Sequence, residues 1–410
     1  MSPEVSPTDP DQTCTDDSSH ISVSKLNGNT ISTPRKLATV RKIDGWTLFS
    51  KNLVLYTIEG WTVLLKKSKG FRVGEFVLFV EVDSFMPATD PATKEIFAEA
   101  GDPVVFDGEN GYRARTQTFA YGERGPRVLS QGHIFKLEDF PKIQSDIRRI
   151  QNEAGNDTQS FLKRVRQIDY SSLLGIRKFE NGNKGPGGAL GKIPYFIPKT
   201  DMERVQNCPN LFIKPKYREM VYQESMKMDG TSMTVYFVAN SSKYFANLNR
   251  LPLKGGSRPA YAKGRFGVCS KNLDLNNVQK NHYWDTALRE DLHTKLSTFG
   301  QSIAVQGELV GWNIQGNRHQ CPKGTYHFYV FSIWDIELQK RWPPTAVETW
   351  ARAQGLKHVP VLGYVTIPKI ARDHQDLLTR ANLKLGEGMV FKSCADGRWF
   401  KVLSNRYILK

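Results

Sequence analysis

The sequence predicts an α+β protein with an N-terminal β-barrel and a larger C-terminal domain of antiparallel sheets with flanking helices. Three observations lead to this prediction. The 410 residues are too many for one typical core, so two domains are expected. Short β-rich runs between Asp-Gly and Glu-Gly turns come first, and longer strand-like runs around one helical segment follow. With 39% hydrophobic and 24% charged residues, the chain has the composition of a globular protein.

The first part of the chain changes texture near residue 37. Residues 1–36 are rich in Ser, Thr, Asp and Pro and poor in aromatic residues, which predicts a disordered acidic tail. Residues 37–140 hold several short strand-like runs, among them VGEFVLFVEVDSFMP, which ends at a proline. Strands at this spacing favour a small nucleic-acid-binding barrel such as an OB-fold, although a sandwich would give a similar pattern.

Residues 141–192 are predicted to form a helical and glycine-rich linker. The helical part carries basic residues at Arg148, Arg149, Lys163, Arg164 and Arg166. These positions suit a solvated helix face as well as contact with phosphates. The glycine-rich part, NGNKGPGGALGK, lacks the G-x-x-x-x-G-K-[ST] pattern, so we interpret it as a connector and not as a phosphate-binding loop.

The net charge indicates a polyanionic partner. The chain carries +16 at neutral pH, and its first 24 residues contain five acidic residues and no Lys or Arg. The remainder is therefore more basic than the total. Such an excess favours nucleic acid, because neutralised phosphates release counterions, whereas solubility alone is the plainer alternative.

The cysteines and the hydropathy pattern bear on location. The five cysteines are odd in number and far apart, and no Cys/His cluster indicates zinc or a disulfide framework. An intracellular compartment, cytoplasmic or nuclear, fits best. No apolar run reaches the roughly 18 residues of a membrane helix, so no membrane association is expected. The acidic start also argues against a transit peptide, and no secretory signal is apparent.

Residues 193–410 are predicted to form the second domain. Its strand-like runs include SMTVYFVA, SIAVQGELVGW, YHFYVFSIWDI, GMVFKS and WFKVL. The helical segment YWDTALREDLHTKLSTFG lies between them, which is an α+β pattern.

One lysine in this domain has an unusual setting. The run ESMKMDGTSMTVYF looks like two strands around an Asp-Gly turn, and Lys227 stands just before that turn between two methionines. A lysine with a pKa near ~10.4 is a poor nucleophile, but apolar neighbours or a bound cation lower that pKa. Asp229 has the right chemistry for a metal's water shell, and Gly230 permits close backbone approach to a ligand. An ordinary hairpin with a lysine at its edge remains the alternative on this motif alone.

Motifs further along the chain resemble those of the covalent nucleotidyltransferases, the superfamily of polynucleotide ligases and mRNA capping enzymes. KMDG resembles the nucleophile motif of that superfamily. The motifs that follow it recur here in the same order: FGVCSKNLDL, VQGELVGWNIQG, YHFYVFSIWDI, EGMVFKS and WFKVLSNRYIL. The OB candidate precedes the transferase domain, and the lead-in reads YFIPKTDMERVQN. This layout is similar to that of the nick-sealing RNA ligases of the Deinococcus–Naegleria type, over roughly residues 37–410.

The resemblance implies ATP-dependent RNA ligation in three steps. Lys227 attacks the α-phosphate of ATP to give lysyl-AMP and pyrophosphate. AMP then moves to an RNA 5′-phosphate, and a 3′-hydroxyl finally displaces AMP to seal the strand, typically at a nick in a duplex. Each step is an in-line displacement at phosphorus, so catalysis consists of positioning and charge neutralisation.

The resemblance also assigns roles to charged residues. Asp229, Glu308 and Glu387 would surround a divalent cation, Mg²⁺ or Mn²⁺, which accept oxygen ligands. Glu308 would also contact the nucleotide. Lys401 would neutralise the α-phosphate in all three steps. Many relatives carry a second lysine two positions on, where this chain has Leu403, so that role is absent or filled by Lys392.

Other residues are assigned to the nucleobase and to RNA. Phe331 is expected to stack on adenine opposite Val390, with Phe328 as the rival and an ordinary core aromatic as the alternative. Gln315 would serve phosphate or RNA. Lys271 and Asn272 occupy positions where the family usually has Arg-Asn, and lysine lacks the planar fork of arginine, which puts the phosphate contact in doubt.

Two other functions remain open at this stage. One is a capping-type guanylyltransferase, and the other is a non-catalytic RNA-binding protein with a relic transferase domain. The intact set of Lys227, Glu308, Glu387 and Lys401 argues against a relic. The leading prediction is an RNA ligase that acts as a monomer on RNA with 3′-hydroxyl and 5′-phosphate ends, in RNA repair.

Overall fold

The computed structural model describes most of the chain beyond the predicted acidic tail. All but the last two residues of that tail lie outside the described residues, and so does most of the glycine-rich connector. The described ranges are 35–122, 125–180, 188–251, 263–277, 281–384 and 386–409.

The N-terminal part contains three small sheets that form the barrel, and a fourth sheet beside them. The barrel sheets have the strand orders β1-β5-β11, β2-β3-β4 and β10-β9, and the fourth has the order β12-β6-β8-β7. The strands are β1 (Ala38–Lys42), β2 (Gly45–Ser50), β3 (Leu53–Ile58), β4 (Trp61–Lys66), β5 (Phe76–Val80), β6 (Ser84–Pro87), β7 (Asp102–Phe106), β8 (Glu109–Arg113), β9 (Thr116–Ala120), β10 (Arg127–Gln131), β11 (His133–Lys136) and β12 (Arg177–Lys178).

Alternation along the barrel strands decides which side chains enter the core. In β3, Val54, Tyr56 and Ile58 are buried and the residues between them are not. Two tryptophans of this domain differ in exposure, because Trp61 is completely buried whereas Trp46 is 54% exposed.

The segment expected to be a helical linker packs on the N-terminal domain. Helix α2 (Pro141–Ala154) buries Ile143, Ile147 and Ile150, a stripe at helical spacing, in the same core as β1 and β5. Helix α3 (Thr158–Val165) adds Phe161 and Val165 to that core. Three of the five basic residues noted in this segment form ion pairs: Arg149 and Arg164 both contact Glu153, and Arg166 contacts Glu59. A third helix of this part is α1 (Pro91–Ala98).

The C-terminal part contains two large sheets. One has eight strands in the order β13-β18-β17-β16-β19-β20-β21, with β22 also paired to β20, and the other has five in the order β14-β25-β24-β15-β23. The strands are β13 (Ala189–Lys192), β14 (Glu203–Arg204), β15 (Tyr222–Lys227), β16 (Thr231–Ala239), β17 (Gly264–Cys269), β18 (Leu273–Leu275), β19 (Ile303–Gly311), β20 (Tyr326–Asp335), β21 (Lys340–Arg341), β22 (Lys357–His358), β23 (Val361–Val365), β24 (Gly388–Ser393) and β25 (Trp399–Leu403).

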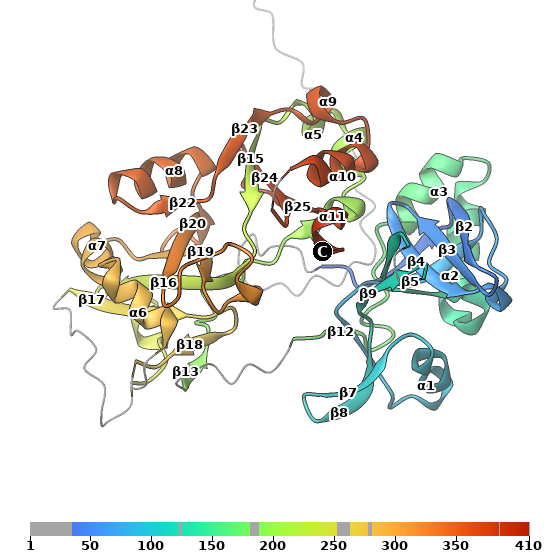
Figure 1. Cartoon of the computed structure of the whole chain (residues 1–410), viewed down its shortest axis with the longest axis horizontal. Coiled ribbons are helices and arrows are strands. Elements are labelled where there is room, and N and C mark those ends of the chain that lie inside the picture. The colour runs from blue at the N-terminus through green and yellow to red at the C-terminus, as the bar shows by residue number, and fades with distance from the viewer. Residues whose placement is uncertain are drawn as a thin grey trace, which may run out of the picture. The chain divides into compact units, whose positions relative to one another are not determined.

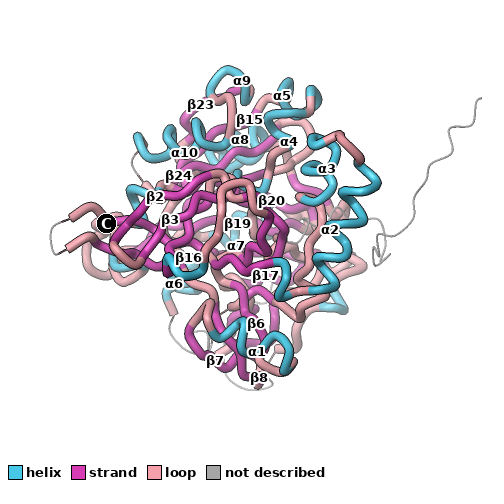
Figure 2. Tube along the Cα trace, turned by 90° about the vertical axis from the view of Figure 1, so that its right-hand side faces the viewer, coloured by secondary structure: helices cyan, strands magenta, loops and turns pink. Residues whose placement is uncertain are grey.

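Each large sheet has its own helices and its own apolar core. Helices α6, α7 and α8 pack on the eight-stranded sheet. The remaining helices of this part, α4, α5, α9, α10 and α11, lie around the five-stranded sheet, as Figures 1 and 2 show. The helices of this part are α4 (Asn210–Ile213), α5 (Pro215–Glu219), α6 (His282–Arg289), α7 (Leu292–Phe299), α8 (Pro344–Ala353), α9 (Ile367–Ile370), α10 (His374–Leu383) and α11 (Asn405–Ile408). None of the described helices is long and apolar enough to span a membrane.

The chain passes from one large sheet to the other at the Asp-Gly turn. Strand β15 pairs with β23 and β24, whereas β16 pairs with β17 and β19, so the two strands do not form a hairpin. The sequence interpretation of two strands around a turn was right for the strands and wrong for their pairing. Gly230 makes the crossing possible, because a Cβ there would lie 2.4 Å from the carbonyl oxygen of Leu309.

Candidate active site

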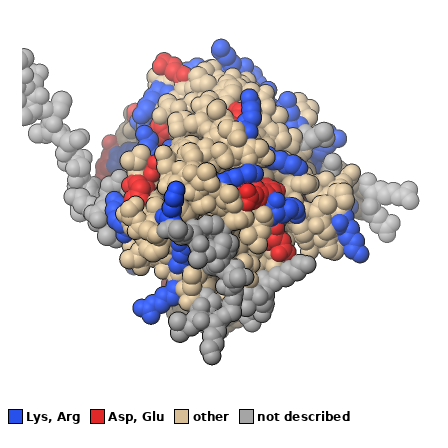
Figure 3. Space-filling model, turned by 90° about the vertical axis from the view of Figure 1, so that its left-hand side faces the viewer, with Lys and Arg blue, Asp and Glu red and all other residues tan. Residues whose placement is uncertain are grey.

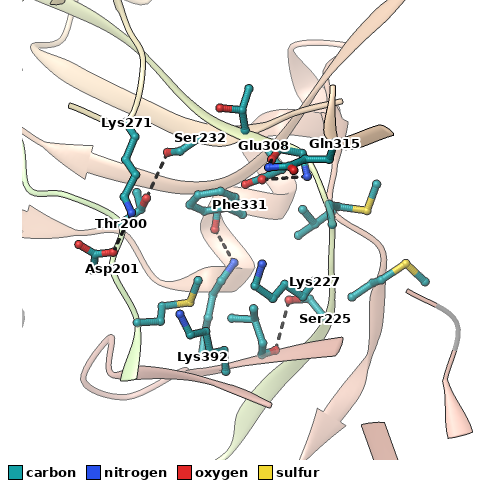
Figure 4. A pocket seen from close by; sticks show the side chains of 18 residues that line it. Thr200, Asp201, Ser225, Lys227, Ser232, Lys271, Glu308, Gln315, Phe331 and Lys392 are labelled. Atoms are coloured by element: carbon teal, nitrogen blue, oxygen red, sulfur yellow. Dashed lines mark hydrogen bonds and ion pairs between the residues drawn. The ribbon is translucent and has the colours of Figure 1, made fainter. Parts of the chain in front are cut away.

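A cavity of about 270 Å³ lies where the two large sheets approach each other. Figure 4 shows Lys227 and Lys392 entering it from the five-stranded sheet, and Glu308 and Phe331 from the eight-stranded sheet. Its lining residues are Thr200, Asp201, Met202, Ser225, Met226, Lys227, Met228, Gly230, Thr231, Ser232, Lys271, Glu308, Gln315, Phe331, Val359, Val390, Lys392 and Lys401. Most predicted site residues therefore face one space, whereas Asp229, Asn272 and Glu387 are not part of the lining.

Lys227 is the last residue of β15 and forms an ion pair. Its Nζ lies 2.5 Å from Glu387 Oε2. Burial alone would lower the pKa of Lys227, but the carboxylates of Glu387 and Glu308 outweigh it and the net pKa is raised. The raised pKa keeps the amine protonated at neutral pH. The apolar neighbours expected to lower the pKa do not suffice, which leaves a bound cation as the physical route to a free amine.

The three predicted metal carboxylates all act on this one amine. Glu308, Glu387 and Asp229 each interact electrostatically with Lys227. Glu308 accepts a hydrogen bond from the Gly230 backbone N–H at 3.2 Å. Burial raises the pKa of Glu308 to about 7, and the nearby Glu387 adds to the shift while Lys227 opposes it. Within the described ranges, no three His, Cys, Asp or Glu side chains stand together as a ready-made metal site.

Two further lysines enter the cavity from β24 and β25. Lys401 pairs in register with Val390, and Arg204 of β14 lies beside it on the other side. Burial, followed by the charges of Arg204 and Arg35, lowers the pKa of Lys401 to about 7. Burial and Arg341 lower the pKa of Lys392 to about 7 as well. Both amines are therefore poised to gain a proton when an anion arrives.

A β-bulge turns Phe331 into the cavity. Gln306 pairs with Ser332 and Gly307 with Val330, so Phe331 is the extra residue of β20. It lines the cavity together with Val390, and the Lys392 Nζ donates a hydrogen bond to its carbonyl oxygen at 2.5 Å. The rival Phe328 is completely buried in the core of the eight-stranded sheet and cannot reach a ligand.

Two of the three predicted RNA contacts, Lys271 and Gln315, line the cavity, whereas Asn272 does not. Lys271 is 3.5 Å from Asp201 and belongs to a network of alternating charges with Lys178, Lys199 and Glu180. Asn272 lies next to it, and its carbonyl oxygen accepts a hydrogen bond from the backbone of Ile193. Gln315 donates from Nε2 to the carbonyl oxygen of Gly230 at 3.3 Å.

Sequence reasoning missed several residues of the site. Thr200 and Asp201 come from the lead-in segment, which the resemblance located without assigning roles. Arg204 of the same segment is buried against the ring of Trp61 at 4.9 Å, and its Nε and Nη1 make no hydrogen bond within the described residues. A buried arginine next to Lys401 could have been suspected only from a strand pairing that sequence does not reveal.

Comparisons with known proteins agree with this geometry. Residues 220–403 match the family model described as RNA ligase, and residues 37–137 match one described as an OB-fold domain. The search of curated proteins found no match.

Solved structures of an RNA ligase from Naegleria gruberi are similar to the chain. A mutant with AMP and Mn is 27% identical with a TM-score of 0.65, and the match covers 91% of this chain and 98% of that one. Another mutant with ATP and Mn is 26% identical with a TM-score of 0.64 and the same coverage. The form with PPi gives 27% and 0.64.

The chain is therefore an enzyme with an N-terminal OB-fold domain and a C-terminal domain of the nucleotidyltransferase type. Residues 220–403 form an RNA ligase domain, and the chain is similar in sequence and structure to the RNA ligase of Naegleria gruberi, the type that the sequence predicted.

Proposed function

We propose that the chain is an ATP-dependent RNA ligase that seals 3′-hydroxyl and 5′-phosphate ends at nicks through lysyl-AMP. The observation that carries this proposal is the position of Lys227 in a cavity with three further lysines, the carboxylate of Glu308 and the aromatic ring of Phe331. The Naegleria relatives with ATP or AMP and Mn support the choice of nucleotide and metal. Sealing of this kind would serve RNA repair.

The residues around the cavity divide the work of the first step. Phe331 and Val390 would hold the adenine between them. Lys401, and Lys392 beside it, would gain protons and neutralise the α-phosphate. The Lys227 Nζ, once deprotonated, forms a bond to the α-phosphorus, and the bond to the leaving pyrophosphate breaks. The amine held against Glu387 needs no large movement, because it already lines the cavity.

A divalent cation fits the chemistry of the three carboxylates, although within the described residues they do not stand together as a complete coordination site. Asp229, Glu308 and Glu387 supply carboxylate oxygens, which Mg²⁺ and Mn²⁺ prefer. Held there, Mg²⁺ or Mn²⁺ would supply positive charge that offsets the carboxylates now raising the pKa of Lys227.

Lys271 is our proposed contact for RNA phosphate, with Asn272 and Gln315 nearby. It lines the cavity and is held by Asp201, a carboxylate that a phosphate could replace. The basic composition of the chain favours the same partner. On the face in Figure 3, Lys and Arg side chains are scattered among uncharged residues with few acidic groups. We also propose that the chain contacts RNA as a monomer.

The location and the domain limits remain proposals too. Of the described cysteines, Cys208, Cys321 and Cys394 are free thiols, which supports a reducing compartment such as cytoplasm or nucleus. We place the OB-fold domain at 37–140, the linker at 141–192 and the transferase domain at 193–410, with the two linker helices packed on the first domain.

One experiment separates the proposal from its rivals. The purified chain is incubated with labelled ATP or GTP and Mn²⁺, and then with a nicked RNA duplex that carries a 5′-phosphate. We expect a covalent adduct with AMP, mapped to Lys227, followed by a sealed strand. A GMP adduct would indicate a capping enzyme, and no adduct with either nucleotide would indicate a relic domain.

A further inference from the structure

Contacts from two other segments converge on Asp229, the carboxylate of the nucleophile motif. Its Oδ2 accepts a hydrogen bond from the Tyr407 hydroxyl at 2.8 Å and lies 3.8 Å from Arg318 Nη1. Its backbone N–H donates to His319 Nε2 at 3.1 Å. Within the described residues, no hydrogen bond or ion pair reaches the other oxygen, Oδ1.

Tyr407 is linked by hydrogen bonds to the backbone of Glu387, another of the three proposed metal carboxylates. It belongs to the single turn α11, whose cap, Ser404, accepts the Tyr407 N–H on its side-chain Oγ at 3.2 Å. The Ser404 N–H in turn donates to the carbonyl oxygen of Glu387 at 2.9 Å. A short chain of hydrogen bonds therefore runs from the Glu387 backbone through Ser404 and Tyr407 to Asp229.

The loop that follows β19 completes the arrangement. Gln315 and Asn317 adopt φ values of 48° and 54° in this loop, which non-glycine residues rarely do. Asn317 fixes its shape by exchanging two hydrogen bonds with the backbone of Cys321, at 2.8 and 2.9 Å. Arg318 and His319 then meet Asp229 from the same loop. Such strain is retained where the surrounding structure gains from a specific position.

We propose that Tyr407 is a positioning residue that ties down one oxygen of Asp229 and thereby presents the other to a divalent cation or its water. This inference rests on the proposed function and adds a residue to it. A neutral hydroxyl suits the task, because it restricts the carboxylate and leaves its negative charge in place. Arg318 contributes less, since its side chain is 44% exposed and its charge is screened by water.

Two observations agree with a neutral donor at this place. Burial and the hydrogen bond to Asp229 raise the pKa of Tyr407 to about 12, so the hydroxyl keeps its proton. The Arg318 guanidinium lies 4.8 Å from the centre of the Tyr407 ring, so the ring is supported from its face independently of the hydroxyl.

The test is Tyr407→Phe, which keeps the ring and removes only the hydroxyl. We expect the Mn²⁺ concentration for half-maximal lysyl-AMP formation to rise about tenfold, with the rate at saturating Mn²⁺ within about twofold of the parent. A second measurement needs no turnover: the increase in melting temperature that Mn²⁺ produces in the presence of AMP should be smaller in the variant at the same Mn²⁺ concentration.

The matched control is Tyr364→Phe. Its hydroxyl also donates to a carboxylate, Glu348 Oε2 at 3.0 Å, but Glu348 is not one of the proposed metal carboxylates. This variant should keep the parental Mn²⁺ dependence. An unchanged Mn²⁺ dependence in Tyr407→Phe would overturn the inference, and so would an equal loss of rate at every Mn²⁺ concentration. If the parent chain forms no adduct at all, the proposed function fails instead.

Discussion

The five-stranded sheet supplies the cavity with amines, whereas the eight-stranded sheet supplies a carboxylate and an aromatic ring. Lys227, Lys392 and Lys401 all come from adjacent strands of the first sheet. Glu308 and Phe331 come from adjacent strands of the second. The difference supports our proposal that amines of the first wall, formed by the five-stranded sheet, receive phosphate, while Phe331 of the second wall stacks on the base.

The largest effect is expected when the proposed reactive amine, that of Lys227, is removed and its positive charge is kept. Lys227→Arg retains a cation for Glu387, but a guanidinium does not lose its proton in proteins. We expect no lysyl-AMP adduct by mass spectrometry and no sealing of nicked RNA, with a circular dichroism spectrum like that of the parent.

Arginine is the matched variant here because it separates charge from nucleophilicity. Adduct formation by Lys227→Arg would show that another residue carries the AMP, and the first wall would have to be reassigned.

The next largest effect is expected at Lys401. Lys401→Met removes a half-buried amine that we propose neutralises the α-phosphate, and loss of one such group typically costs about 100-fold in rate. Single-turnover formation of lysyl-AMP measures the effect, and Lys384→Met, at an exposed lysine on the end of α10, serves as the control. A rate close to that of the parent would remove Lys401 from the first step.

On the opposite wall, Phe331→Ala should weaken the binding of ATP. Loss of a stacked base typically costs one to three kcal/mol, so we expect the KM for ATP to rise about tenfold with little change in kcat. Phe331→Tyr keeps the ring and should behave like the parent. A fall in kcat at unchanged KM would mean that the ring positions the reacting groups and does not hold the base.

The smallest effect concerns pH and the amines of the first wall. The pKa of Lys401 and that of Lys392 are lowered to about 7, so each amine is charged below that pH and neutral above it. Bound phosphate favours the charged form, so metal-free ATP binding should take up protons and weaken several-fold between pH 8 and 9. Calorimetry in two buffers of different ionisation enthalpy measures the uptake, and an affinity independent of pH would contradict the assignment.

Much of this architecture could be predicted from the sequence, and the limits have physical causes. Motif order predicted the fold class correctly and pointed to the candidate nucleophile and carboxylates, because each motif is a local run of residues. Strand partners are not local, so the sequence did not reveal that β15 and β16 lie in different sheets, or that Arg204 lies beside Lys401.

The choice between two aromatic residues shows the same limit. Phe328 and Phe331 are three residues apart in one strand, and strict alternation puts them on opposite faces without saying which face holds the cavity. The bulge at Phe331 shifts the register there, and nothing in the local sequence indicates it. Likewise, Tyr407 lies 178 positions from Asp229, a separation at which residue patterns carry no information on contact.

The short crossing at residues 228–230 has a mechanical consequence. Only three residues join the end of β15 to the start of β16, and Gly230 is pressed against β19. Residues 359 and 360 form a second short crossing, from β22 to β23, so two short links hold the large sheets together. A nucleotide attached to Lys227 would therefore stay beside one of these links.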